Sequence, residues 1–207
     1  MSARRIGGLI QNTSDNAPEY VKDAINGLPA LKFDGENDFM YNFSTRWMGE
    51  EFSMFIVMKP ENAQKQSFGA LGGISEFLVE INSDTSVTLG SNYPNRVTSA
   101  TGAVTFGAAQ LLTFQRYPVF ANILPTQKVW ESELPGVMKL WNGDNLIGEF
   151  DSSAKKSIIE WGGMMLGNSE GNTLNGVVAE ILVYDRVLNE NEQQYITDYL
   201  TEKYSLK

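Results

Sequence analysis

Carboxylates, with Lys and Tyr, are the side chains of this sequence that could do acid–base or nucleophilic chemistry. The chain contains no histidine and no cysteine, which removes Ser-His-Asp and Cys-His nucleophilic systems and most zinc and copper sites. Glu149 and Asp151 are two residues apart, so in a strand both side chains point to the same face. Glycoside hydrolysis needs only two well-placed carboxyl groups. The sequence therefore keeps that activity open.

The segment Asp34–Asp38 carries the oxygen ligands that calcium prefers. It reads Asp-Gly-Glu-Asn-Asp and offers up to four oxygen-bearing side chains within five residues. It lacks the spacing of an EF-hand loop, and Asp and Asn commonly bind their own backbone in turns. The segment therefore predicts either a calcium site at Asp34, Asn37 and Asp38 or a hydrogen-bonded hairpin turn. We expect no required cofactor, with calcium as the one candidate.

Aromatic side chains in loops are the candidates for sugar binding, because sugars stack their apolar C–H face on a ring while Asn and Asp take the hydroxyls. Trp141 falls within a predicted strand and is expected in the core. Trp47 and Trp161 lie in or near predicted loops, where a Trp more often packs partly buried than serves as a sugar platform. The predicted saccharide site comprises loop residues Asn92, Tyr93, Asn95, Trp130 and Glu131.

Composition limits the partners. The 207 residues carry a formal net charge of −9, which opposes binding to nucleic acid or anionic lipid and leaves neutral polymers, cationic surfaces and divalent cations. No apolar stretch approaches the roughly 20 residues that cross a bilayer, so we expect no membrane insertion. The basic start, Met1–Arg5, is not followed by the apolar region of a signal peptide. An all-β chain of this length is expected to fold as one domain, residues 1–207.

The sequence reads as some ten short strands separated by turns, with one terminal helix. Glu51–Lys59 is the strongest predicted strand, near-continuously apolar and therefore expected to be buried on both faces. Asn142-Gly143 predicts a tight turn between two antiparallel strands. The run Val177–Tyr184 predicts a last strand, and Asn189 with Glu192 predicts a capped helix. Its predicted apolar face comprises Tyr195, Ile196, Tyr199 and Leu200.

Several of these motifs, in this order, resemble the laminin-G-like, concanavalin A-like family of jelly-roll domains. They are the entry segment Asn26–Asp38, the long strand, the Asn-Gly hairpin, and the closing strand and helix with Tyr184-Asp185-Arg186. The resemblance implies an all-β jelly-roll sandwich of two antiparallel sheets with a short C-terminal α-helix. It also implies recognition, because such domains are mostly binding modules. The related laminarinase-type glucanases carry E-x-D-x-x-E, but Ser153 or Ala154 takes the place of the third carboxylate, so we assign no catalytic residue.

One departure from the family concerns the N-terminus. Family members usually begin with an extra strand that contains an aromatic residue, whereas only Met1–Gln11 precedes the equivalent of Asn12–Tyr20. Either Arg4–Ile10 rebuilds that strand, or a sheet edge stays open. Because an open edge presents unpaired backbone groups, this departure favours a homo-oligomer or a component of a larger assembly.

These observations predict a non-catalytic recognition or adhesion module that binds a glycan or a protein surface. We expect it in an extracellular or virion assembly, after folding in the cytoplasm. One alternative is a purely structural virion subunit, such as a capsid decoration or tail component. The other is a divergent glycoside hydrolase. The functional part of this prediction rests on analogy of fold.

Overall fold

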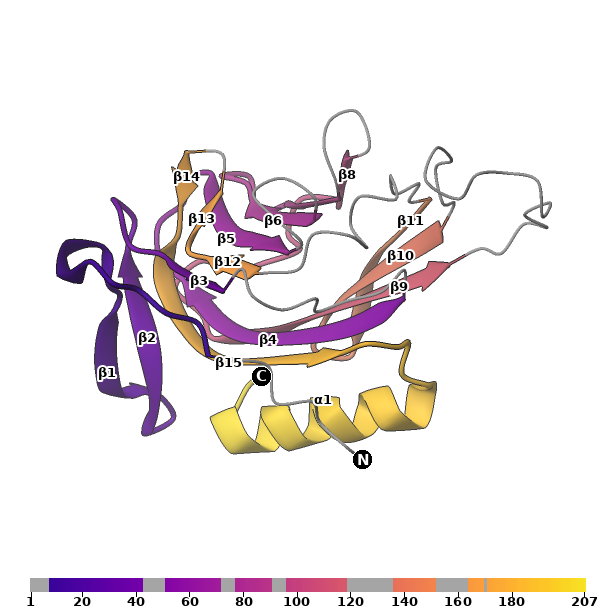
Figure 1. Ribbon diagram of the computed structural model, residues 1–207. Coiled ribbons are helices and arrows are strands. Elements are labelled where there is room, and N and C mark those ends of the chain that lie inside the picture. The colour runs from indigo at the N-terminus through magenta and orange to yellow at the C-terminus, as the bar shows by residue number, and fades with distance from the viewer. Residues whose placement is uncertain are drawn as a thin grey trace.

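Two antiparallel β-sheets face each other in the computed structural model of the chain (Figure 1). The structure describes residues 8–42, 51–71, 77–90, 96–118, 136–151, 164–169 and 171–207. The larger sheet has seven strands in the order β1-β2-β15-β4-β9-β10-β11. They are β1 (Glu19–Ile25), β2 (Leu28–Asp34), β15 (Asn175–Tyr184), β4 (Phe52–Pro60), β9 (Gln110–Pro118), β10 (Gly136–Asn142) and β11 (Asn145–Asp151).

The smaller sheet has six strands in the order β3-β12-β5-β6-β7-β8. They are β3 (Met40–Asn42), β12 (Met164–Leu166), β5 (Gln66–Leu71), β6 (Phe77–Ile81), β7 (Val87–Gly90) and β8 (Arg96–Thr98). The remaining elements are the pair β13 (Asn168–Ser169) and β14 (Asn172–Thr173), the 3₁₀ turn η1 (Ser14–Asn16) and the helix α1 (Glu190–Tyr204). The predicted fold class, two antiparallel sheets with one C-terminal helix, is confirmed.

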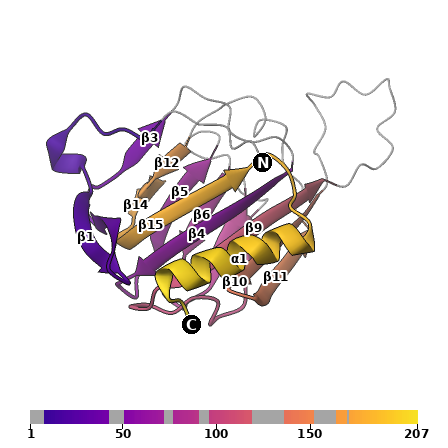
Figure 2. The ribbon, with the colours of Figure 1, turned by 90° about the horizontal axis from the view of Figure 1, so that it is seen from below.

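Strand β4 contributes to two apolar layers. Met54, Ile56 and Met58 point into the core between the two sheets, while Phe55 and Val57 pack under α1 on the outer face of the larger sheet. All five side chains are 0% exposed, which confirms the prediction of burial on both faces. Figure 2 shows α1 lying across this outer face. In the described part of the chain no helix is long and apolar enough to span a bilayer.

The helix α1 begins as predicted. The side chain of Asn189 accepts a hydrogen bond from the Glu192 amide, and the Glu192 side chain accepts one from the Asn189 amide, so a complete capping box closes the first turn. The predicted apolar face is partly wrong: Ile196 and Leu200 are buried, but Tyr195 and Tyr199 are 68% and 45% exposed. Residues four apart align along a helix, so Tyr204, and not the two exposed tyrosines, continues the buried row.

The hairpin between β10 and β11 forms one residue later than the sequence predicts. Asn142 pairs with Asn145 and ends β10, and Gly143, at φ +56°, begins the turn. The Asn142 side chain donates to the carbonyl of Ala103 at 2.9 Å and to Oε1 of Gln110 at 3.0 Å. These bonds keep Asn142 in the strand. The predicted strand over 158–161 lies outside the described residues.

Strand β1 was not predicted from the sequence. Most of its side chains are exposed or half-buried, so it lacks the apolar run that marks a buried strand. Asn26 and Gly27, at φ +52° and +71°, form its turn to β2, and this Asn-Gly pair was the available sign of a hairpin. Ahead of β1, Ile10 forms an isolated bridge to Tyr41 at the edge of the smaller sheet. The rest of the predicted segment Arg4–Ile10, residues 4–7, lies outside the described residues.

Candidate functional site

The loop residues predicted to bind a saccharide, namely Asn92, Tyr93, Asn95, Trp130 and Glu131, all lie outside the described residues. The first described residue after residues 91–95 is Arg96, at the start of β8. Arg96 lies 3.9 Å from the carboxylate of Glu80, which is 1% exposed and also contacts Lys65 at 3.1 Å. The amide of Asn172 donates to the same carboxylate at 3.0 Å. These contacts hold Arg96 at the start of β8, and the saccharide site stays a prediction.

The predicted calcium segment is a hydrogen-bonded turn. Oδ1 of Asp34 accepts from the amides of Glu36 and Asn37 at 2.8 and 3.2 Å, and Oδ2 of Asp38 accepts from the Asp34 amide at 2.9 Å. Asp38 is 7% exposed, and burial is the main cause that raises the pKa of its carboxyl group. Within the described ranges no three Asp, Glu, His or Cys residues cluster as metal ligands. The observed bonds fit the turn interpretation, and calcium binding stays a prediction.

The acids on β11 lie at the surface. Glu149 and Asp151 are exposed while Phe150, between them, packs against the core, so the two carboxylates share a face as predicted. Oε2 of Glu149 is 3.1 Å from Nζ of Lys139 on the neighbouring strand. Ser153 and Ala154 lie outside the described residues. The described geometry is that of a solvated cross-strand ion pair.

A polar groove of about 390 Å³ lies where the β10–β11 hairpin meets the first turns of α1. Trp141 lines it and is half-buried rather than in the core, which corrects the prediction. The reason is the period of two along β10: Met138 and Leu140 point into the core, so Lys139 and Trp141 point out. The other lining residues are Lys139, Gly143, Asp144, Leu146, Glu190, Gln193, Gln194 and Thr197.

Hydrogen bonds fix the walls of this groove. Nε2 of Gln194 donates to Oδ1 of Asp144 at 3.0 Å and to Oδ1 of Asp198 at 2.9 Å, so the helix and the hairpin turn are tied together. Nζ of Lys139 lies 5.5 Å from the centre of the Tyr117 ring. Burial raises the pKa of Tyr117, and the charges of Glu190 and Glu149 add to this effect while Lys139 opposes it. The groove therefore combines one large aromatic ring with amides and carboxylates.

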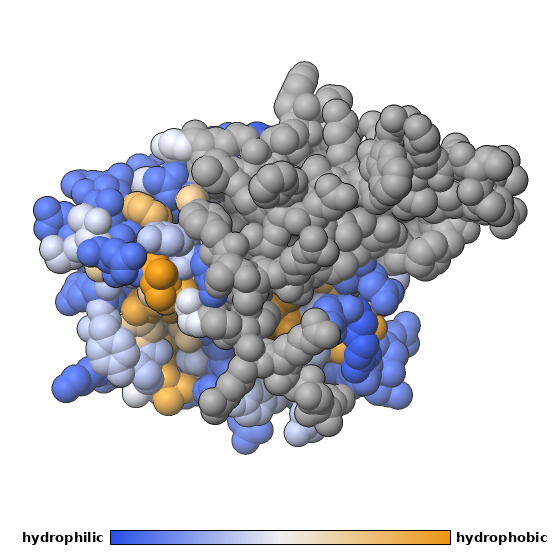
Figure 3. Space-filling view, viewed as in Figure 1, coloured by the Kyte–Doolittle hydropathy of each residue, from blue (hydrophilic) through white to orange (hydrophobic). Residues whose placement is uncertain are grey.

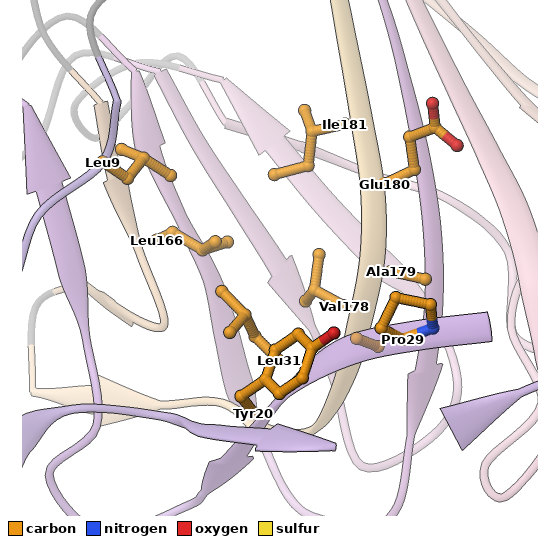
Figure 4. A pocket seen from close by; sticks show the side chains of 10 residues that line it. Leu9, Tyr20, Pro29, Leu31, Leu166, Val178, Ala179, Glu180 and Ile181 are labelled. Atoms are coloured by element: carbon orange, nitrogen blue, oxygen red, sulfur yellow. The ribbon is translucent and has the colours of Figure 1, made fainter. Parts of the chain in front are cut away.

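An apolar pocket of about 350 Å³ lies on the other side of the larger sheet, where β2 separates from β15. Figure 4 shows Val178 and Ile181 of β15 pointing toward Leu9 and Leu166, while Glu180 points to the opposite side of the strand. The pocket is also lined by Tyr20, Pro29, Ala30, Leu31 and Ala179. In the space-filling view, hydrophobic residues reach the surface on the left, on the side of strands β1 and β2 (Figure 3).

Sequence reasoning missed both hollows. The groove could have been found from the alternation in Val137–Trp141, because two core-facing residues in this strand place Trp141 outside. Nothing in the sequence around Gln193 and Gln194 indicates that these residues of the first helical turns line a groove. The apolar pocket forms where β2 separates from β15, and no pattern of neighbouring residues in the sequence predicts that point.

Comparison with solved structures confirms the jelly-roll sandwich. No protein-family model and no curated protein sequence matches the chain. The native heptameric SAP-like pentraxin from Limulus polyphemus is similar, with a TM-score of 0.60, 14% identity and 81% of each chain covered. Domain 4 of AbnA, a GH43 extracellular arabinanase from Geobacillus stearothermophilus solved with arabinotriose, has a TM-score of 0.57 and 13% identity, covering 87% of this chain and 81% of that one.

Part of a toxin binding domain has a similar fold. The binding domain of Paraclostridial Mosquitocidal Protein 1 matches with a TM-score of 0.61 and 9% identity. The match covers 89% of this chain and 46% of the toxin domain, so the chain spans about half of that structure. At these identities the likeness shows a shared fold and leaves ligands and activities as properties of the other proteins.

Proposed function

We propose that the chain is a non-catalytic recognition module that binds a neutral glycan, and that the groove at Trp141 is its binding site. One observation carries this proposal: an outward-facing Trp141 lies in a hollow whose other walls bear hydrogen-bonding amides and carboxylates. Within the jelly-roll fold, the sequence motifs described above favour the laminin-G-like group.

The groove has the composition that sugar recognition requires. A sugar ring stacks its C–H face on an indole, and neighbouring amides and carboxylates bind the hydroxyls in fixed directions. Trp141 and Leu146, which is 50% exposed, supply apolar surface. Gln193 and Asp144 supply hydrogen-bonding groups at the rim. A volume of about 390 Å³ falls in the range of small-molecule sites.

Charge favours a neutral glycan over an anionic one. The groove is lined by two carboxylates, Asp144 and Glu190, and by one cation, Lys139, which is already paired with Glu149. The whole chain carries a net charge of −9, so sugars that bear carboxylate or sulfate groups are repelled. The pentraxin, arabinanase and toxin-domain folds support the general role of a binding module by analogy.

The proposal is tested by screening the intact chain on a glycan array and measuring the best neutral glycan by calorimetry. Trp141→Ala is expected to weaken binding at least tenfold, because loss of one stacked ring removes on the order of 1.4 kcal/mol or more. Trp130→Ala is the matched variant. It is expected to bind like the parent chain if the groove is the site, and to lose binding if the predicted loop site is used instead.

Circular dichroism checks that both variants keep the fold. Failure of every glycan to bind the intact chain would contradict the proposal of glycan recognition. Binding that survives Trp141→Ala unchanged would leave a glycan-binding module but reject the groove. Cleavage of a polysaccharide that disappears in Glu149→Gln would overturn the non-catalytic assignment.

A further inference from the structure

Asparagine is followed by glycine at Asn26, Asn142 and Asn175. Such a pair can deamidate without an enzyme, because glycine has no side chain to keep its amide nitrogen away from the preceding carboxamide. The glycine nitrogen loses its proton and bonds to Cγ of the asparagine, and the carboxamide nitrogen takes up a proton and leaves as ammonia. Water then opens the resulting succinimide to aspartate or isoaspartate. The reaction therefore requires a glycine amide that is free to move.

Two of these glycine amides lie in well-paired parts of the larger sheet. The Gly143 amide donates to the carbonyl of Leu111 at 2.8 Å, and the Asn142 side chain makes the two hydrogen bonds described above. Gly176 is buried within β15, which pairs there with β2 on one side and with β4 on the other. Attack by either nitrogen therefore requires neighbouring strands to separate.

The remaining pair forms the turn between β1 and β2. Asn26 and Gly27 are both exposed, and the Gly27 amide donates no hydrogen bond to any described residue. A single pair, Ile25 with Leu28, closes the turn, because an irregularity in register separates it from the regular ladder that ends at Val21. Opening this turn therefore disturbs one pair of residues, and such local openings at loop tips cost little free energy.

The Asn26 carboxamide also holds the last turn of α1. Its Nδ2 donates to the carbonyl oxygen of Lys203 at 3.0 Å. Carbonyls in the last turn of a helix have no partner within the helix, so the β1–β2 hairpin supplies one. Deamidation replaces this donor by a carboxylate oxygen, which repels the carbonyl. It also places a negative charge at the negative end of the helix dipole.

We propose that Asn26 is a site of spontaneous deamidation, and that its conversion to aspartate or isoaspartate releases the C-terminal end of α1 from the β1–β2 hairpin. The reaction consumes one water molecule and liberates one ammonia, so it needs neither an oxidant nor a reductant. The first turn of α1 keeps its own capping box at Asn189 and Glu192, so the release is confined to the last turn.

Peptide mapping by mass spectrometry tests the site on the intact chain, held in mildly alkaline buffer and sampled over time. The peptide that contains Asn26 is expected to gain the mass of an amide-to-acid change at least tenfold faster than the peptides that contain Asn142 or Asn175. The same chain in concentrated urea is the matched control. There the three peptides are expected to react at similar rates, because glycine follows each asparagine and no strand protects it.

Hydrogen exchange tests the consequence for α1. In Asn26→Asp, the amides of residues 202–206 are expected to exchange roughly three- to tenfold faster than in the parent chain, and those of the first helical turn at the same rate. Asn26→Gly, which fits the positive φ and removes the donor without adding a charge, is expected to show a smaller increase.

Several results would overturn the inference. Reaction at Asn142 or Asn175 as fast as at Asn26 in the folded chain would contradict the proposed selectivity. So would a preference for Asn26 that persists in urea, because the fold would then not be its cause. No reaction at Asn26 while the urea-treated chain reacts would show that this turn is protected as well. Unchanged exchange in Asn26→Asp would show that the bond to Lys203 does not hold the helix end.

Discussion

Strands β4 and β15 pair side by side in the larger sheet, yet they are buried to very different degrees. Ile56 of β4 and Ile181 of β15 are directly paired and both point into the core between the sheets. Ile56 is 0% exposed, whereas Ile181 is only half-buried. The difference comes from their neighbours, because β4 pairs with β15 and β9, whereas residues 179–184 of β15 pair only with β4 among the strands that the structure describes.

This contrast teaches that the apolar composition of a strand does not determine its burial. The second half of β15, residues 179–184, is contacted on its outer face by α1. Oε2 of Glu180 accepts from Nζ of Lys203 at 2.8 Å and from the hydroxyl of Tyr204 at 3.0 Å. Tyr184 meets Phe55 edge-on, with ring centres 6.2 Å apart. Pairing on both sides stabilises β4, whereas pairing with β4 and contact with the helix stabilise the second half of β15.

The largest expected effect on the free energy of unfolding comes from replacing the paired residues Ile56 and Ile181. Ile56→Ala is expected to lower the free energy of unfolding by about 3–4 kcal/mol, because it leaves a cavity in a fully packed core. Ile181→Ala should cost about 1–2 kcal/mol, since part of the side chain already contacts solvent. Both values come from denaturant unfolding followed by circular dichroism.

Equal costs for the two alanine variants would contradict the contrast and show that the edge of β15 is covered.

The next largest effect on stability is expected from weakening the contact between α1 and β15. Glu180→Gln removes the charge that Lys203 and Tyr204 bind and is expected to cost about 1 kcal/mol, because charge-assisted bonds at a half-buried site exceed surface pairs. Glu61→Gln is the control, since Glu61 forms a surface pair with Lys59 at 3.3 Å. Equal losses of stability would show that the helix does not depend on this contact.

Local patterns in the sequence were enough to predict much of this fold. The apolar run of β4 predicted a strand buried on both faces, because no turn or charge interrupts it. Asn142-Gly143 predicted the hairpin, and Asn189 with Glu192 predicted the helix start, because turns and caps depend on residues close in sequence. For Asp34–Asp38 the sequence predicted a hydrogen-bonded turn as one of two alternatives. The hydrogen bonds observed there join residues within this same segment.

Features that depend on distant segments could not be predicted in this way. Tyr195 and Tyr199 have the composition of a buried face, but the docking of α1 on β15 and β4 selects Ile196 and Leu200. Trp141 is apolar in type, but the helix that forms the other wall of its groove is about 50 residues away in sequence. The pairing of β15 with β2 ends at Val178, and nothing within β15 encodes that.

Alkaline titration tests the same attachment of the helix. Burial, with the hydrogen bond to Glu180, raises the pKa of Tyr204 from 10.0 to about 12. The folded state therefore keeps the proton where the unfolded state loses it. This contribution is complete below pH 10 and is lost as the pH rises toward about 12. The pKa of Lys203 is raised by the same carboxylate and acts in the same direction.

Melting temperatures between pH 9 and 12 should therefore decline less steeply in Tyr204→Phe than in the parent chain. Tyr195→Phe serves as the control, because the Tyr195 side chain is 68% exposed and its removal leaves the Glu180 contact intact. Parallel declines in all three proteins would mean that Tyr204 does not carry the linkage.

The smallest expected effect on stability concerns acidic pH and the first turn of α1, which follows β15 in the chain. Nη1 and Nη2 of Arg186 donate to the two carboxylate oxygens of Glu192 at 2.7 and 2.8 Å. These bonds, with the one from the Asn189 amide, lower the pKa of Glu192 from 4.5 to about 2. The stabilisation is present above pH 4.5 and is lost as the pH falls toward about 2. Glu192→Gln should therefore show a shallower loss of helix stability over this range by circular dichroism. A slope equal to that of the parent would mean that the buried row Ile196, Leu200 and Tyr204 positions the helix on β15 without help from this charge pair.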